Sequence, residues 1–229
     1  RTYLLYGTDT GVLCLRRASD GALLQCMQAT DARVSSLDSS GSTLALGTWS
    51  GELQLFDLPS LRRRGVHRGK GSLTALRFSP DGEWLAVARS ARTERRTPEL
   101  DKRERGTADL DPPGNNRIEL WSDSKGDWSR QHELRGHRNL ISDLAWLGAD
   151  LLSCSWDRSL RLWSFTKSPP QQRARWTTEV RHLLTDLATR LEGAQFLVGG
   201  WSRSLEDATL WSGALLYPTR SAAQNPASD

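Results

Sequence analysis

The sequence contains few cysteines, one methionine and no long apolar segment. Cys14, Cys26 and Cys154 are odd in number and lie in apolar, strand-like runs, which favours reduced, buried thiols and an intracellular location. No stretch is apolar for 18 residues, and no secretory signal pattern is visible at the start, which is Arg1 rather than Met. We therefore expect a cytoplasmic protein with no membrane partner.

The chain is also poor in lysine, so its positive charge comes mainly from arginine. Lys and Arg total 31 against 27 Asp and Glu, a formal net charge of +4 that is too small to indicate nucleic-acid binding. The densest basic stretch is "LRRRGVHRG", residues 61–69. We interpret it as a solvated outer strand whose charges guard a sheet edge. The alternative is a patch for phosphate or an acidic partner.

Sites for metals and nucleotides are not indicated. The four histidines and three cysteines show no ligand spacing, so we expect no metal site and no cofactor. The stretch "GVHRGKGS" has three residues between its first two glycines, whereas a phosphate-binding loop has four. Gly71 also follows Lys70 where that loop has Ser or Thr. The next segment, "LTALRF", alternates like a strand rather than a helix.

A repeated pattern runs through the chain. An apolar strand, a small polar turn and a strand ending in a large residue recur in "STLALGTWSGELQLFD", "DLLSCSWDRSLRLWS" and "QFLVGGWSRSLEDATLWS". A weaker copy is "YLLYGTDTGVLCLRR", and another is interrupted between "WLAVARSA" and "NRIELWS". The closing residues are Leu15, Phe56, Trp121, Trp163 and Trp211. Without the insertion the period is about 42 residues, which is typical of propeller repeats.

Each unit has one strand before this pair and a more polar, outer strand after it. Four antiparallel strands per unit predict an all-β fold, a β-propeller with about five blades present. These five blades either close by themselves or are part of an incomplete propeller. The expected blades cover approximately residues 1–28 (partial), 29–67, 68–135, 136–175 and 176–217, followed by a polar tail, 218–229. Residues 89–114 are polar and charged, and we expect a mobile loop inserted in the third blade.

The stretch "GHRNLISDLAWLGADLLSCSWDRSLRLW", residues 136–163, resembles a WD repeat. The resemblance covers roughly residues 1–217, although no unit closes on the strict Trp-Asp dipeptide. It implies a hydrogen-bonded structural tetrad, which here would be His137, Ser153, Asp157 and Trp163. His, Ser and Asp are also the residues of a nucleophilic triad, but no oxyanion site or cleft is indicated. We favour the structural interpretation and predict no catalytic residue.

The tetrad is incomplete in the other units. The positions that correspond to it hold Thr30, Ser50 and Phe56 in the second blade, Gly69 and Asn115 in the third, and Val180 and Ser202 in the fifth. We therefore expect these blades to be held mainly by apolar packing.

Tryptophans recur just before the turn between the second and third strands. Trp49, Trp156 and Trp201 take this place in three blades, and Thr8 takes it in the first. The resemblance to WD repeats implies that this face binds partners, and tryptophans gathered on one face are typical of an interaction hot spot. Packing against the neighbouring blade is the alternative. The insertion extends from the same face. It is either an inert loop or a segment that orders when a partner binds.

Two functions stay open. The first is a non-catalytic scaffold that presents one propeller face to protein or peptide partners. The second is the regulatory or sensor part of a larger enzyme, a kinase or NTPase switch whose catalytic domain lies outside this chain. Because the family usually has seven blades, we expect a fragment of a longer propeller, with fusion to other domains. Nucleic acid is the weakest candidate partner, and a steep salt dependence would identify it.

Overall fold

The computed structural model describes residues 2–91, 116–124, 126–165, 168–177, 183–190, 195–203 and 210–218. Within these ranges every regular element is a β-strand, and the strands form five antiparallel sheets. The predicted all-β, propeller-like architecture is confirmed. The same ranges contain no helix long and apolar enough to cross a membrane.

The five sheets follow one another along the chain and are called blades 1 to 5. Blade 1 comprises β1 (Tyr3–Gly7), β2 (Val12–Arg17) and β3 (Leu23–Gln28). Blade 2 comprises β4 (Val34–Ser40), β5 (Thr43–Thr48), β6 (Glu52–Asp57) and β7 (Arg62–Arg68). Blade 3 comprises β8 (Ser72–Phe78), β9 (Trp84–Ser90), β10 (Arg117–Ser124) and β11 (Asp127–Arg135). Blade 4 comprises β12 (Ile141–Leu147), β13 (Asp150–Ser155), β14 (Ser159–Ser164) and β15 (Gln171–Thr177). Blade 5 comprises β16 (Leu183–Arg190), β17 (Gln195–Arg203) and β18 (Leu210–Pro218).

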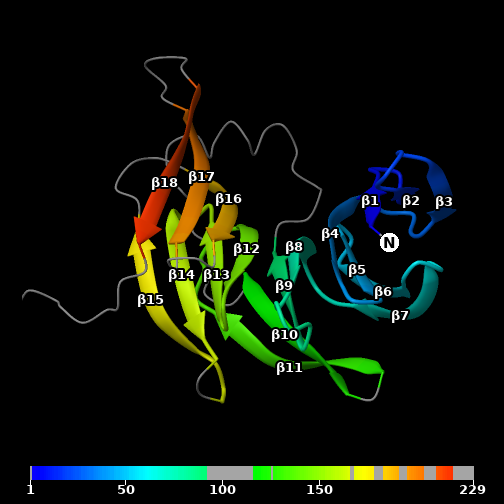
Figure 1. The fold of residues 1–229 in the computed structure, drawn as a ribbon. Helices are drawn as coiled ribbons and strands as arrows, with labels where there is room; N and C mark the ends of the chain where they lie inside the picture. The colour runs from blue at the N-terminus through cyan, green and yellow to red at the C-terminus, as the bar shows by residue number, and fades with distance from the viewer. Residues whose placement is uncertain are drawn as a thin grey trace, which may run out of the picture.

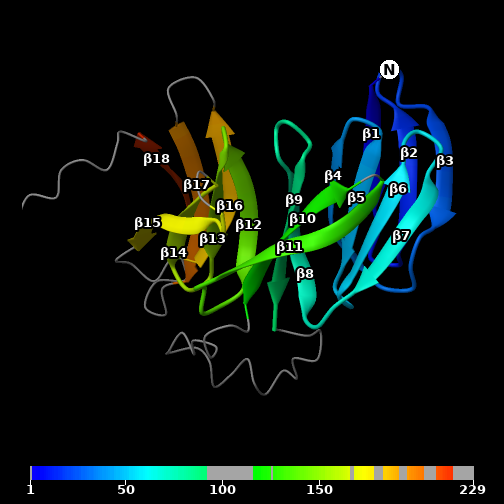
Figure 2. The same ribbon diagram turned by 90° about the horizontal axis from the view of Figure 1, so that it is seen from below.

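The blades stand side by side in chain order, from β1 at one end to β18 at the other (Figures 1 and 2). In blades 2, 3 and 4 the strands pair in sequence order, so the polar fourth strand of each lies at a sheet edge. The first strands, β4, β8, β12 and β16, contact one another from blade to blade. The sequence order therefore places the apolar strands in the middle of each blade and the charged strands outside.

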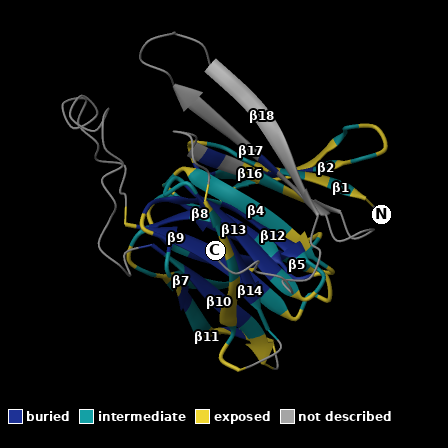
Figure 3. Ribbon diagram, turned by 90° about the vertical axis from the view of Figure 1, so that its left-hand side faces the viewer, coloured by how far each residue is buried: buried dark blue, intermediate teal, exposed yellow. Residues whose placement is uncertain are grey.

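Alternating side chains hold neighbouring blades together. Leu44 and Leu46 of β5 point toward blade 1 and pack with Leu13 and Leu15. The intervening Ala45 packs with blade 3 instead. The buried residues accordingly lie in the middle strands of the blades and, in blades 3 and 4, also in the first strands β8 and β12 (Figure 3). Each fully buried leucine stabilises the fold by about 2 kcal/mol through removal of apolar surface from water.

Polar contacts add to this packing near the first strand of each blade. The first strands of blades 3 and 4 carry a β-bulge, and its extra residue directs a side chain at the next blade. Thr74 Oγ1 donates to the Ile141 carbonyl at 2.6 Å, and Asp143 Oδ2 accepts from the Leu187 N–H at 2.9 Å. The hydroxyl of Ser142 makes the same contact with blade 5. Backbone groups that would otherwise be buried without partners are thereby satisfied.

The cysteines correct one expectation from the sequence. Cys14 and Cys26 face each other across β2 and β3, with 4.2 Å between their Cα atoms, and form a disulfide. Cys26 is also exposed, so only Cys154 is a buried free thiol, with its pKa raised to about 12 by burial. The prediction of three reduced, buried thiols is wrong for two of them, and the argument for an intracellular location loses that support.

The disulfide predicts a simple labelling result. The chain unfolded in denaturant without a reductant should take up one iodoacetamide group, at Cys154, because the other two sulfurs are bonded to each other. With a dithiol reductant added first, three groups should be taken up. Intact mass spectrometry distinguishes the two. Three groups without the reductant would show that the bond is absent.

The boundary of the insertion was also predicted wrongly. Arg89 and Ser90 belong to strand β9, and Arg89 is among the most buried side chains, with 1% of its surface exposed. Residues 92–115 lie outside the described residues, so the mobility of the insertion stays a prediction. The arginine-rich stretch forms β7 at the edge of blade 2, where Arg62 and Arg68 pair with Asp57 and Glu52.

Candidate functional site

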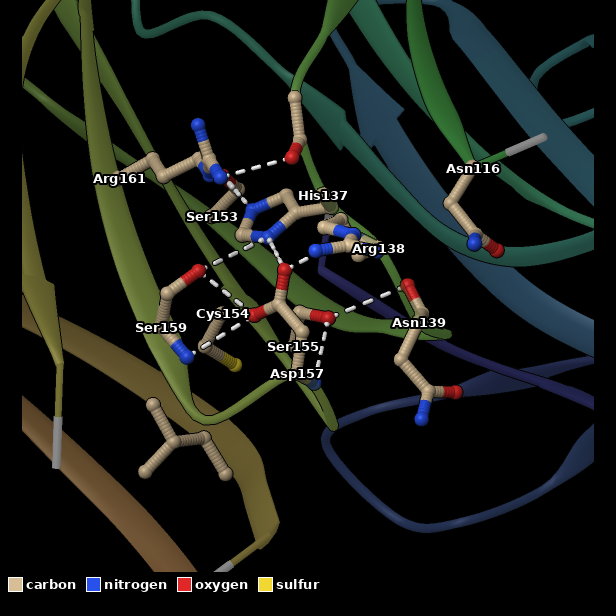
Figure 4. Close-up of polar contacts among 12 residues, drawn as sticks. Asn116, His137, Arg138, Asn139, Ser153, Cys154, Ser155, Asp157, Ser159 and Arg161 are labelled. Atoms are coloured by element: carbon tan, nitrogen blue, oxygen red, sulfur yellow. Dashed lines mark hydrogen bonds and ion pairs between the residues drawn. The ribbon is translucent and has the colours of Figure 1, made fainter. Parts of the chain in front are cut away.

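His137, Ser153, Asp157 and Trp163 come together in blade 4 (the first three are labelled in Figure 4). His137 lies in the segment before β12, Ser153 in β13, Asp157 in the following turn and Trp163 in β14. The His137 Nδ1 atom lies 3.0 Å from Asp157 Oδ2, and its Nε2 atom lies 2.7 Å from Ser153 Oγ. Trp163 Nε1 donates to the same Ser153 hydroxyl at 2.9 Å. The four side chains thus form one continuous hydrogen-bonded chain.

Asp157 also organises the turn between β13 and β14. Its Oδ1 atom accepts from the backbone N–H of Ser159 at 2.9 Å and from the Ser159 hydroxyl at 2.6 Å. Its Oδ2 atom accepts from the backbone N–H of Arg138 at 2.9 Å. Arg158, at the tip of the turn, has a positive φ of 66°. The carboxylate therefore ties the turn to the segment that enters the blade.

The protonation states follow from burial. Burial lowers the pKa of His137 and outweighs the opposing pull of Asp157, so the imidazole is neutral. Burial raises the pKa of Asp157, but the hydrogen bonds from His137, Ser159 and Arg138 together hold it below its usual range. A neutral His137 donates through Nδ1 to Asp157 and accepts the Ser153 hydroxyl at Nε2, while Ser153 accepts from the indole of Trp163. Every polar side-chain atom of the four tetrad residues then has a hydrogen-bond partner.

The geometry of these four side chains indicates a structural role rather than a catalytic triad. Ser153 is completely buried, and its hydroxyl is engaged by both His137 and Trp163. A nucleophile must instead reach a substrate beside preorganised oxyanion donors. In the part of the chain that the structure describes, no three His, Cys, Asp or Glu side chains are grouped so that they could hold a metal ion.

Blade 3 has a different buried polar network, which the sequence did not predict. Arg89 Nε lies 2.8 Å from Glu119 Oε2, and its Nη1 donates to the Gly51 carbonyl at 2.8 Å. Trp121, the counterpart of Trp163, directs its indole N–H at the same carboxylate, 3.3 Å away. A Cβ on Gly69 would lie 2.7 Å from the Arg89 guanidinium carbon, so a larger residue there would have to displace the guanidinium. Blade 3 therefore has this polar network beside its apolar clusters, and mainly apolar packing of the blade stays a prediction.

Blade 2 is closer to the expectation of mainly apolar packing. The corresponding side chains of blade 5 lie outside the described residues. Phe56 replaces the indole and is completely buried in an apolar cluster. Thr30 donates to Glu52 at 3.3 Å and Ser50 contacts the Thr48 hydroxyl at 2.9 Å, near the surface. Asn115, Val180 and the side chain of Ser202 lie outside the described residues.

Two of the predicted surface tryptophans take equivalent places. The backbone N–H of Trp49 donates to the Arg33 carbonyl at 3.1 Å, and that of Trp156 donates to the Leu140 carbonyl at 2.9 Å. Both rings are partly buried and partly exposed. The Arg33 guanidinium lies over the Trp49 ring, 5.7 Å from its centre. Trp201 belongs to strand β17, but its side chain lies outside the described residues.

Thr8 does not belong to this set. The Thr8 hydroxyl accepts from the Val12 N–H at 2.9 Å, as the Thr48 hydroxyl accepts from the Glu52 N–H at 3.0 Å. Thr8 is therefore the counterpart of Thr48, and its neighbour Asp9 stands where Trp49 does. The pairing of Leu4 with Arg16 likewise makes Arg16, rather than Leu15, the closing residue of blade 1.

A shallow cleft of about 480 Å³ lies at the opposite end of blade 3. It is lined by Glu83, Trp84, Ser122, Asp123 and Gly126, from the start of β9, the end of β10 and the turns beside them. The Trp84 ring packs against Phe165 of blade 4, with 5.9 Å between the ring centres. Trp84 offers a matched comparison for the tryptophans of the other end.

Comparison with protein families identifies the repeats. The model for the WD domain, G-beta repeat, matches residues 61–93 and 128–164. The second range contains the whole tetrad of blade 4, and the first runs through β7, β8 and β9. A comparison with curated proteins gave no match. Two segments of the chain therefore match WD40 repeats, and the antiparallel sheets are consistent with blades of a WD-repeat β-propeller.

Proposed function

We propose that this protein is a non-catalytic interaction scaffold whose partner binds the end of the blades that carries Trp49 and Trp156. WD40 repeats generally act as scaffolds that bind proteins or peptides. The main support for this proposal is the difference in exposure between two sets of tryptophans. Trp121 and Trp163 are 8% and 3% exposed inside the blades, whereas Trp49 and Trp156 keep part of their rings at the surface.

The charges around these tryptophans favour a partner with carboxylates. Arg33, Lys70 and Arg138 are exposed in the segments that join successive blades at this end. In the described residues none of the three has a carboxylate within ion-pair distance. A partner that places an apolar side chain on a tryptophan and an acidic one beside it would use both features.

The second candidate is a regulatory role within a larger enzyme, such as a kinase or a nucleotide-driven switch. The same face would then bind the catalytic domain. The burial of the tetrad supports a structural rather than a catalytic role for its side chains. Capture of a kinase or NTPase domain by this face would favour the second candidate over the first.

Replacing Trp49 and Trp156 by alanine tests the proposal. The amount of each protein captured from a lysate is measured for the parent chain and the double variant. We expect the double variant to lose the proteins that the parent captures, because each hot-spot tryptophan contributes about 2 kcal/mol, or about thirtyfold in affinity. Trp84→Ala is the matched control, since Trp84 is also half-buried but lies at the opposite end. Thermal melting verifies that the variants fold. Equal capture by folded double variant and parent would contradict the proposal.

A further inference from the structure

Blade 4 contains a buried arginine that no described carboxylate neutralises. Arg161, on β14, is 7% exposed and lies beside His137 of the tetrad (Figure 4). Its Nη2 donates to the Gly136 carbonyl at 2.7 Å and its Nη1 donates to the side-chain oxygen of Gln172. Its Nε has no hydrogen-bond partner among the described residues. Both acceptors are neutral, so the positive charge of the guanidinium has no counter-charge in contact with it.

A second arginine stands directly opposite the first. The register of β14 and β15 pairs Arg161 with Arg175, so the two side chains leave the same face of the blade on adjacent strands. Arg175 is exposed, and no described carboxylate lies within ion-pair distance of it. Like charges at opposed positions of neighbouring strands destabilise a sheet. The pair therefore has a place for an anion between the two guanidinium groups.

The tetrad carboxylate does not fill this place. Burial lowers the pKa of Arg161, the negative charge of Asp157 opposes this effect, and the positive charge of Arg175 lowers the pKa further. Asp157 is not within ion-pair distance of Arg161, and its Oδ2 atom already faces the His137 ring and the Arg138 N–H. Its attraction therefore acts on Arg161 only from a distance.

Blade 3 shows the same arrangement in a balanced form. Glu119 and Glu133 take the positions of Arg161 and Arg175 there, because they stand opposite each other on β10 and β11, two residues before the closing Trp121. Four arginines surround these two carboxylates: Arg89, Arg117, Arg130 and Arg135. Two like charges at these positions are thus compensated in blade 3, whereas the described residues of blade 4 provide no compensating side chain.

We propose that Arg161 and Arg175 together bind a phosphate group. A phosphate group carries close to two negative charges at neutral pH and has three acceptor oxygens, which match two guanidinium groups in charge and in donors. A carboxylate has a single charge and would leave one guanidinium without a counter-charge. Inorganic phosphate and a phosphorylated side chain of a protein partner share this chemistry. The site is independent of the proposed tryptophan face, because inorganic phosphate alone tests it.

Thermal unfolding of the purified chain in inorganic phosphate is the first experiment. Compared with chloride at the same pH and ionic strength, about 10 mM phosphate should raise the melting temperature of the parent by about 3 °C, as for a dissociation constant of about 1 mM. Arg175→Gln should lose this rise, and its fold should persist because Arg175 is exposed on an edge strand. Acetate at the same ionic strength should give no comparable rise.

Arg173→Gln is the matched control. It removes the same charge from the same strand, but Arg173 pairs with Asp150, so this variant should keep the rise in melting temperature. Phosphate also stabilises proteins without binding, through exclusion from their surface, and that effect should be equal in the parent and both variants. An equal rise in the parent and Arg175→Gln, or an equal loss in the two variants, would overturn the proposal.

A second experiment identifies the source of the phosphate group. Fluorescence anisotropy measures the binding of a fluorescein-labelled peptide of glycine and serine that contains one phosphoserine. Binding at least about tenfold tighter than that of inorganic phosphate assigns the group to a phosphorylated protein partner, and equal binding assigns it to free phosphate. An unphosphorylated peptide that binds as tightly as the phosphorylated one would show that the two arginines do not recognise phosphate.

Discussion

Replacing Glu119 by leucine should lower the free energy of unfolding by about 3–5 kcal/mol, because it leaves the buried Arg89 without its carboxylate. The two side chains are 1% and 3% exposed, so the uncompensated guanidinium could not be hydrated without opening the blade. The other cations beside Glu119, Arg117 and Arg130, are more accessible and can turn to water. Urea unfolding followed by circular dichroism measures the loss.

The double variant Arg89→Met with Glu119→Leu is the control. It removes both charges at similar volume, so most of the lost stability should return. This pattern separates a buried ion pair from simple loss of packing. If the double variant is as unstable as the sum of its single variants, the two residues do not act as a pair.

The same pair predicts an acid-sensitive contribution. Burial raises the pKa of Glu119, but the guanidinium groups of Arg89 and Arg117 together hold it below its usual range. A lowered carboxyl pKa in the folded state stabilises the protein above the unfolded value of 4.5, and the contribution is lost as the pH falls through the folded value. The double variant should therefore lose less stability on acidification than the parent.

Replacing Asp157 by asparagine should lower the free energy of unfolding by about 1–3 kcal/mol. The amide keeps the shape of the carboxylate but turns one oxygen into a donor, which would face the donors of His137, Arg138 or Ser159. Thermal and urea unfolding provide the measurement. Asp150→Asn, which removes a surface pair with Arg173, should cost less than about 1 kcal/mol. Equal stability of Asp157→Asn and the parent would show that the tetrad does not stabilise the blade.

The contribution of the tetrad to the stability of the fold also depends on pH. The pKa of His137 is lowered by burial, so the unfolded chain binds a proton more readily than the folded one. Its contribution is present above pH 6.5, the usual pKa of histidine, and is lost as the pH falls below that value. The Asp157 contribution is lost at still lower pH, because its usual pKa is 3.8.

The sequence predicts features that repeat and misses those that depend on contacts between distant segments. The propeller-like blades could be predicted because apolar alternation and turn residues recur in every unit. The four tetrad side chains could be predicted because one unit resembles a WD repeat. Arg89 was assigned to the insertion because it directly precedes a polar run. Its partner Glu119 stands thirty residues later on the far side of that insertion.

Register explains the other errors. Alternation tells which face a residue occupies, but it does not tell which residue lies opposite on the next strand. Cys14 and Cys26 therefore looked like unrelated thiols, although pairing of β2 and β3 brings them together. Thr8 was placed one residue off because the turn had no tryptophan to mark it. The hydroxyl contacts of Thr8 and Thr48 give the correct alignment.

The most direct test of the scaffold function is the dissociation constant of a captured partner, purified and measured against the parent chain, Trp49→Ala with Trp156→Ala, and Trp84→Ala. The proposed face predicts a dissociation constant at least about thirtyfold higher for the double variant, and an unchanged one for Trp84→Ala. Equal affinities for all three folded chains, or a loss confined to Trp84→Ala, would contradict it.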